Sequence, residues 1–230
     1  MEASFSAKQY ARAERKERVR ALNEPPHLTV GEEIFNAVSH GAGAVLAVAA
    51  MTVLLAKAPD GPAVLAACVY GGSMIFMMLS SCLYHAMPAR SGVKRLLRRF
   101  DYTSIYLLIG GTFAPLLLVY LGGELGVTLF CVQWGVIAVG VTLVAVFGPG
   151  RFRPLHFTLY FLIGWSGVML LPDFYRSNRP LLWCILMGGV VYTAGMIPFA
   201  RSRKYDHCVW HLFVLTAAAL QWIGIVRFLY

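Results

Sequence analysis

The segment DHCVWHLFVLTAAALQWIGIVRFL, residues 206–229, combines the two features that decide how this chain folds. It is apolar and long enough to cross a bilayer as a helix, which takes about 20 residues. It also begins with His207 and His211, whose spacing of four residues places both rings on one face of a helix. Two neutral imidazoles in that arrangement can take two positions around one metal ion, and zinc commonly accepts such ligands.

Six further apolar segments precede this one, at residues 34–56, 63–87, 100–121, 125–147, 154–171 and 181–200. The hydrophobic share is 58% of the 230 residues and the charged share 13%, whereas a soluble domain carries about 25% charged residues. The fifth segment is the shortest, and it lies between breaks at Gly148-Pro149-Gly150 and Pro172-Asp173. We predict an all-α, polytopic membrane protein whose seven-transmembrane helix bundle occupies residues 31–230.

Residues 1–30 differ from the rest because lysine, arginine and glutamate alternate along them. This stretch has neither an apolar core nor a cleavage-site pattern, so we interpret it as neither a signal peptide nor a span. We expect a solvated or membrane-surface helix that ends at Pro25-Pro26.

Basic residues indicate how the spans are oriented. The tail and the second, fourth and sixth loops carry sixteen of the 20 lysines and arginines, and the other side carries four. The positive-inside rule then predicts a cytoplasmic N-terminus and an external C-terminus in the plasma (inner) membrane. The net charge of +9 is explained by this asymmetry, so we predict no nucleic-acid partner.

The five cysteines are scattered, with no pair spaced for a zinc ribbon or a redox motif, so no disulfide framework is predicted. We expect each of them to be a small buried hydrophobic residue. Cys82 and Cys208 are close in sequence to candidate histidines and could approach a metal.

Polar residues of three segments fall at one membrane level. His85 closes the second segment at the cytoplasmic side, Asp101 opens the third there, and His207 and His211 open the seventh. Ionisable residues inside spans are functional candidates because they cost free energy. We predict a metal site with His85, His207 and His211 as ligands.

Ser81 lies four residues before His85 and thus on the same helical face. Two alternatives stay open. His85 or Asp101 could be an interfacial group bonded to backbone or water. Ser81 could bond to a carbonyl of its own helix.

Other polar residues allow several interpretations. Glu32, Asn36 and His40 recur at a spacing of four and form a ridge that faces either the bundle or the headgroups, with His40 a possible competing ligand. We expect His156 to be interfacial. Asp206 is either an N-cap or an acceptor for His207.

Inside the third segment, Gly110 and Gly111 permit close helix approach, and Pro115 frees a backbone carbonyl. We interpret this stretch as one that serves helix packing.

Together these residues resemble the hemolysin III branch of the progestin and adipoQ receptor family, which is similar to the alkaline ceramidases. The quoted motifs are Glu32 or Glu33 with Asn36 and Ser39-His40-Gly41, then Ser81 and His85, then Asp101, then His207 and His211. The resemblance implies that the three histidines hold zinc and that Asp101 contacts its bound water, with Ser81 nearby. One departure is Tyr102, where relatives often have histidine.

Three protein ligands on zinc leave a fourth position open, as in catalytic sites. Asp101 would then serve as general base and Ser81 as a hydrogen-bond donor to the oxyanion. Because the site lies at membrane depth, the leading hypothesis is hydrolysis of a lipid amide or ester, with membrane lipids as partners. The alternatives are a receptor-like or regulatory protein with a structural zinc, and a membrane-perturbing cytolysin. No pattern in the sequence specifies an oligomeric state.

The orientation can be tested with reporter fusions. A reporter at the N-terminus should be cytoplasmic and one at the C-terminus external, because basic loops are retained inside. Both ends reporting the same side would contradict an odd number of spans.

Overall fold

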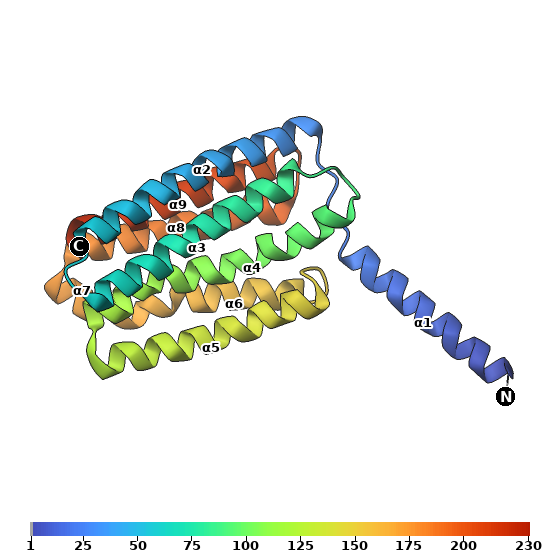
Figure 1. Cartoon of the computed structure of the whole chain (residues 1–230), viewed down its shortest axis with the longest axis horizontal. Coiled ribbons are helices and arrows are strands. Elements are labelled where there is room, and N and C mark those ends of the chain that lie inside the picture. The colour runs from blue at the N-terminus through green and yellow to red at the C-terminus, as the bar shows by residue number, and fades with distance from the viewer. Residues whose placement is uncertain (1) are drawn as a thin grey trace.

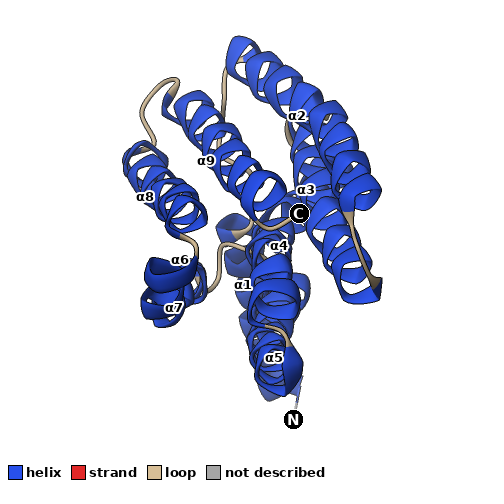
Figure 2. Cartoon of the chain, turned by 90° about the vertical axis from the view of Figure 1, so that its left-hand side faces the viewer, coloured by secondary structure: helices blue, strands red, loops and turns tan. Residues whose placement is uncertain are grey.

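The computed structural model describes residues 2–230, with side chains from residue 9 onward. The elements in chain order are α1 (Glu2–Leu22), α2 (Val30–Lys57), α3 (Gly61–Ala86), α4 (Gly92–Ala114), the π-helical η1 (Pro115–Leu121), α5 (Gly123–Phe147), α6 (Arg153–Trp165), the 3₁₀-helical η2 (Ser166–Leu170), α7 (Leu171–Ser177), α8 (Arg179–Arg201) and α9 (Asp206–Phe228). Figure 2 shows only helices and loops in this described part of the chain.

Seven helical segments within residues 2–230 are long and apolar enough to cross a membrane. Five of them are single helices, α2, α3, α5, α8 and α9, while α4 continues into η1 and α6 continues through η2 into α7. The predicted all-α, seven-span architecture is therefore confirmed.

Polar caps fix where these helices begin. The Thr29 hydroxyl accepts the Glu32 N–H, and the Glu32 carboxylate accepts the Thr29 N–H, which makes a capping box at the start of α2. Asp60, Ser91 and Asn178 accept backbone N–H groups in the same way at the starts of α3, α4 and α8. The first N–H groups of a helix have no partner inside it, so these caps favour starts at the edges of the apolar segments.

The fifth span corrects the prediction. We expected it to end at residue 171, before a break at Pro172-Asp173, but the chain stays helical to Ser177. Pro172 lies in the first turn of α7, where proline is tolerated because an N–H there would have no helical partner. The resulting segment, Arg153–Ser177, has 25 residues, which is long enough to cross a membrane. The break at Gly148-Pro149-Gly150 is confirmed between α5 and α6.

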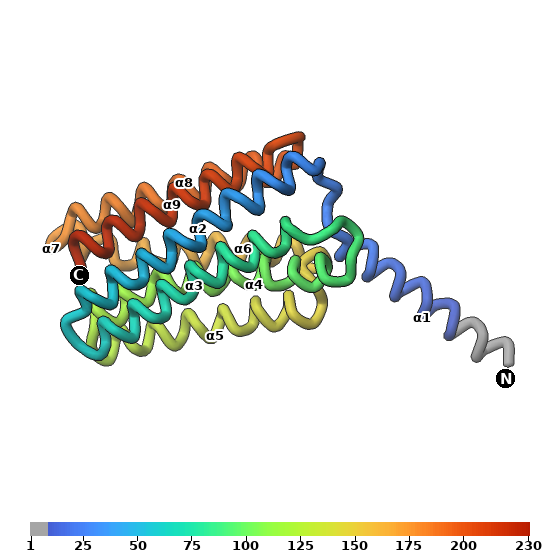
Figure 3. The backbone as a smooth tube through the Cα atoms, turned by 45° about the horizontal axis from the view of Figure 1, so that its top comes forward, coloured from blue at the N-terminus to red at the C-terminus, as the bar shows by residue number. Residues whose placement is uncertain are grey.

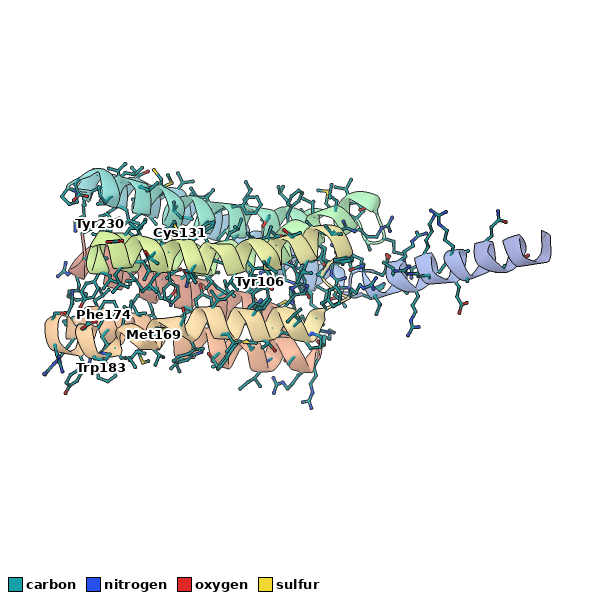
Figure 4. All side chains as sticks on the ribbon, turned by 90° about the horizontal axis from the view of Figure 1, so that it is seen from below. Tyr106, Cys131, Met169, Phe174, Trp183 and Tyr230 are labelled. Carbon is teal, nitrogen blue, oxygen red and sulfur yellow. The ribbon has the colours of Figure 1, made fainter. Side chains whose placement is uncertain are left out.

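Because consecutive spans run in opposite directions, one end of the bundle collects the starts of α2, α4, α6 and α9 and the ends of α3, α5 and α8. The loops at this end carry most of the basic residues, and we call it the basic end. In Figure 1, α1 projects away from the basic end and the C-terminus lies at the opposite end. Figure 4 shows Phe174 at that opposite end and Tyr106 nearer to α1.

The first and last spans lie side by side. The closest helix pairs are α2 with α3, α3 with α4, and α8 with α9, and α2 also packs along α9 (Figures 1 and 3). The main core draws Tyr70, Met74 and Met77 from α3, Leu116 from η1 and Val214 from α9. Helix α3 contributes much of this core and packs against both α2 and α4, so His85 lies between the helices that carry Glu33 and Asp101.

Two glycines allow α4 to approach its neighbours closely, as predicted. A Cβ atom at Gly111 would overlap the Ser73 side chain of α3, and one at Gly110 would overlap Ile137 of α5. After them, Pro115 begins η1, because proline has no N–H for the regular α-helical ladder.

Helix α1 ends at Leu22, three residues before the predicted stop at Pro25-Pro26, and its described side chains are mostly exposed. The following residue anchors it to the loop between α5 and α6. The Asn23 amide donates to the Phe147 carbonyl and accepts the Gly150 N–H, at 3.0 Å in each case. Met1 lies outside the described residues, as do the side chains of residues 2–8. The division at residue 30 into tail and membrane domain stays a prediction.

Replacing Gly111 tests the α3–α4 contact. Gly111→Val should destabilise the bundle by about 1–3 kcal/mol, because the new side chain overfills a packed interface. Gly135→Val on α5 is the matched control, since a Cβ there meets nothing within 4 Å. Thermal unfolding in detergent should separate the two variants, and equal midpoints would contradict the packing argument.

Candidate metal centre

Three histidines converge at the basic end of the bundle. His85 lies in the last turn of α3, and His207 and His211 lie in the first two turns of α9. Their ring centroids form a nearly equilateral triangle, with separations of 5.0 Å for His85–His207 and 4.9 Å for each of the other two pairs. One ligand nitrogen from each ring lies within 4.8 Å of the others, so the three could hold a metal ion.

The donor set fits zinc. The Nε2 atoms of His85 and His207 are 3.2 Å apart. Two nitrogens on a tetrahedral zinc at 2.0–2.1 Å from the ion would be roughly 3.3 Å apart. His85 and His211 are buried and His207 is half-buried, so the rings lie inside the bundle rather than in bulk water.

A carboxylate lies on the far side of His85. Glu33, in the first turn of α2, meets His85 Nδ1 through Oε2 at 2.7 Å, while its Oε1 pairs with Lys94 Nζ at 2.8 Å. Neither role was predicted from the sequence. In the sequence, Glu33 was recognised only as part of the family motif, and Lys94 was counted only among the basic residues of the loops. Their common membrane level with His85 was a signal that could have found them.

On the other side of the site, His40 stacks flat on His211, with ring centroids 3.7 Å apart and 18° between the ring planes. His40 is not part of the three-histidine cluster, so it does not act as a competing ligand in this arrangement. Ser39 Oγ lies 3.4 Å from His211 Nδ1. Glu32, Asn36 and His40 are all buried, so the predicted polar ridge faces the bundle interior and not the headgroups.

Asp101 and Ser81 lie together beside the histidines. The Ser81 side chain lies within reach of the Asp101 carboxylate, and His85 and Arg98 lie close enough to act on that carboxylate electrostatically. Tyr102, at the position where relatives often have histidine, stacks under the Arg98 guanidinium, and its carbonyl accepts from Tyr160 at 2.8 Å. Asp101 and Ser81 therefore lie on the His85 side of the three-histidine cluster, and their catalytic roles stay a prediction.

An apolar cavity of about 120 Å³ lies next to this site. It is lined by side chains of α3, α4, α6, α8 and α9, including Ile105, one turn after Asp101. Phe199 lines it too, and its ring centroid is 5.6 Å from that of His207. A smaller cavity of about 40 Å³ shares Thr112, Phe113 and other residues with it and reaches Phe174 of α7.

A family model described as "Haemolysin-III related" matches residues 28–222. This chain belongs to that family. It is 35% identical over 202 residues to Hemolysin-3 of Bacillus cereus, covering 86% of this chain and 91% of the relative. It is 32% identical over 203 residues to the Hemolysin-3 homolog of Bacillus subtilis (strain 168), covering 86% and 94%.

A human relative, monocyte to macrophage differentiation factor, is 24% identical over 210 residues, with 88% of this chain and 86% of the relative covered. It fits the predicted relation to the progestin and adipoQ receptor family. The family match and the seven spans together indicate that this haemolysin-III-related chain is a multi-pass membrane protein. A location in the plasma membrane is consistent with its similarity to bacterial proteins.

Two predictions about polar residues of this haemolysin-III-related protein are wrong. His156 is not interfacial but fully buried, because Tyr106 of α4 supplies a hydroxyl 2.9 Å from its Nδ1. Asp206 is not an N-cap, since that position belongs to Tyr205 with a left-handed backbone. Its carboxylate instead accepts from the Arg203 N–H at 3.0 Å and from Arg201 at 3.1 Å, and among the described contacts it has none with His207.

The five cysteines are free, as predicted, but only Cys208 is buried. Cys68 and Cys131 are exposed, and Cys82 and Cys184 are half-buried, so the predicted burial is wrong for these four. Neither Cys82 nor Cys208 is part of the ligand cluster.

Metal content tests the cluster directly. The purified haemolysin-III-related chain should retain about one divalent ion per molecule, and His207→Ala or His211→Ala should abolish retention because two ligands cannot close the site. His27→Ala, at an exposed residue outside the bundle, is the matched control. Elemental analysis of protein in detergent measures the outcome, and full metal content in both ligand variants would contradict the site.

Proposed function

We propose that this protein is a zinc-dependent membrane hydrolase that cleaves a lipid amide or ester. The observation that carries the proposal is the position of Asp101 and Ser81 near His85, one of the three clustered histidines. A metal that only held helices together would need neither an acid nor a hydroxyl at its edge. A catalytic site can use them as general base and oxyanion donor, and it leaves one ligand position to water or substrate.

Zinc bound by the three histidines would lower the pKa of a water molecule to about 7 and so supply a nucleophile at neutral pH. Asp101 accepts the proton of the attacking water and passes it to the departing nitrogen or oxygen of the substrate. Ser81 donates its hydroxyl hydrogen to the oxygen on which negative charge develops. The products are a carboxylic acid and an amine or alcohol, so the atoms of one water are consumed in each turnover.

The cavity supports a lipid substrate. Its lining is apolar and aromatic, it begins one turn from Asp101, and it extends toward the opposite end of the bundle. An acyl chain in this cavity would present its carbonyl group to the histidines at the basic end. Proximity of this kind can supply much of a rate enhancement, because the reacting groups are held together.

The receptor-like protein with a structural zinc remains the alternative, and no described contact favours it over the hydrolase. The cytolysin alternative predicts something different, namely leakage from protein-free vesicles that is insensitive to loss of the histidines. Neither alternative assigns a role to the Asp101–Ser81 pair.

Asp101→Asn separates chemistry from architecture. The amide is nearly isosteric and is not among the three ligands, so zinc content and thermal stability should persist. Hydrolysis should fall by about 10²- to 10⁴-fold, the usual effect of removing a positioned acid–base group. The assay follows release of fatty acid from ceramide and from ester lipids in mixed micelles.

Asp173→Asn, at an exposed residue of α7, is the matched control and should retain activity. Unchanged activity in a zinc-loaded Asp101→Asn variant would overturn the hydrolase proposal. Loss of zinc from that variant would make Asp101 a ligand or an essential support, and the open ligand position would have to be withdrawn.

A further inference from the structure

A buried ion pair connects three helices behind His85. Glu33 of α2 contacts His85 of α3 with one carboxylate oxygen and Lys94 of α4 with the other, at 2.7 and 2.8 Å. The His85 and Lys94 side chains are 0% and 1% exposed, and that of Glu33 is 17% exposed. Long charged side chains are seldom buried this completely without a specific partner.

Lys94 uses all three of its N–H donors. Besides Glu33, its ammonium donates to the Tyr84 carbonyl at 3.1 Å and the Met87 carbonyl at 3.0 Å. Both carbonyls lie at the C-terminal end of α3, where backbone acceptors lack partners within the helix and a cation is favoured. Lys94 therefore anchors the turn that carries His85 and at the same time neutralises Glu33.

We propose that Glu33 is the residue that positions His85 as a metal ligand, with Lys94 as its counter-ion. This inference rests on the metal site of the proposed function. It adds that a carboxylate outside the predicted catalytic residues orients one of the metal ligands. The Glu33 carboxylate accepts the proton on His85 Nδ1. Nε2 is thereby left with a free lone pair, and Nε2 is the atom that lies 3.2 Å from His207 Nε2.

His85 differs in this respect from the other two ligands. The ring of His211 has only neutral hydrogen-bonding neighbours, the Ser39 hydroxyl at 3.4 Å and the Asn36 backbone. His207 has Phe199 and the other histidine rings around it. A charged hydrogen bond is shorter and stronger than a neutral one, so the His85 ring is the most firmly oriented of the three. Loss of such a support typically lowers metal affinity 10- to 100-fold.

Charge pairing explains why the support involves two residues. A single buried charge is costly, and removing one member of a buried pair leaves the other uncompensated. Glu33→Gln alone would therefore weaken binding and destabilise the fold together. A Glu33→Gln/Lys94→Met double variant removes both charges, so the effect on the metal can be measured without an unpaired ammonium in the bundle.

The experiment measures zinc affinity of full-length protein in detergent by competition with a chelator, for wild type, Glu33→Gln and the double variant. Affinity should fall 10- to 100-fold in both variants. Cobalt substituted for zinc should show a visible spectrum altered from that of wild type, a change that a merely structural role would not produce. Glu24→Gln is the matched control, because Glu24 pairs with Arg95 at 3.6 Å and has no contact with a histidine among the described residues.

Wild-type affinity and an unchanged cobalt spectrum in the double variant would overturn this inference while leaving the proposed function standing. A wild-type chain that binds neither zinc nor cobalt would overturn both. If Glu33→Gln fails to fold, the double variant alone decides between these outcomes.

Discussion

Hydrocarbon offers no hydrogen-bond partners, so a polar side chain inside this bundle is stabilised when its own helix, another helix or a bound ligand supplies one. That constraint explains the contacts at the basic end. Glu33, His85 and Lys94 form one connected chain across α2, α3 and α4, and Glu32 of α2 accepts the Tyr205 N–H just before α9 at 2.7 Å. The polar network thus joins the helices at the level where the three histidines meet.

Helix packing makes that network possible. α3 is central, and the glycines of α4 let it approach α3 and α5 closely. α2 packs along α9, so the first and last spans contribute side chains to the same site although they are distant in sequence. Away from the basic end the core becomes apolar, with methionines and aromatic residues of α3, α4 and α9, and the cavity lies on the α6–α8 side. The polar site and the apolar cavity therefore adjoin each other.

Charge is balanced by pairing. Lys94 neutralises Glu33, Arg201 accompanies Asp206, and Arg98 lies between the Glu24 carbonyl, the Tyr102 ring and the neighbourhood of Asp101. A divalent ion among neutral imidazoles would add positive charge beside Asp101, which suits a carboxylate that must stay ionised to accept a proton. In the proposed hydrolase, the same arrangement that makes the buried acid tolerable also suits it to catalysis.

The sequence alone determined the seven spans, because about 20 apolar residues between polar breaks leave few other structures in a membrane. It also brought His85, Asp101, His207 and His211 to one level, since span direction alternates and helical spacing is fixed. Only the tertiary structure decided which partner each polar group meets. Helix rotation and neighbour choice depend on packing, so Glu33 behind His85, His40 stacked on His211 and His156 buried against Tyr106 could not be read from spacing. For the same reason Pro172 looked like a break, although its place in a first helical turn let the span continue to Ser177.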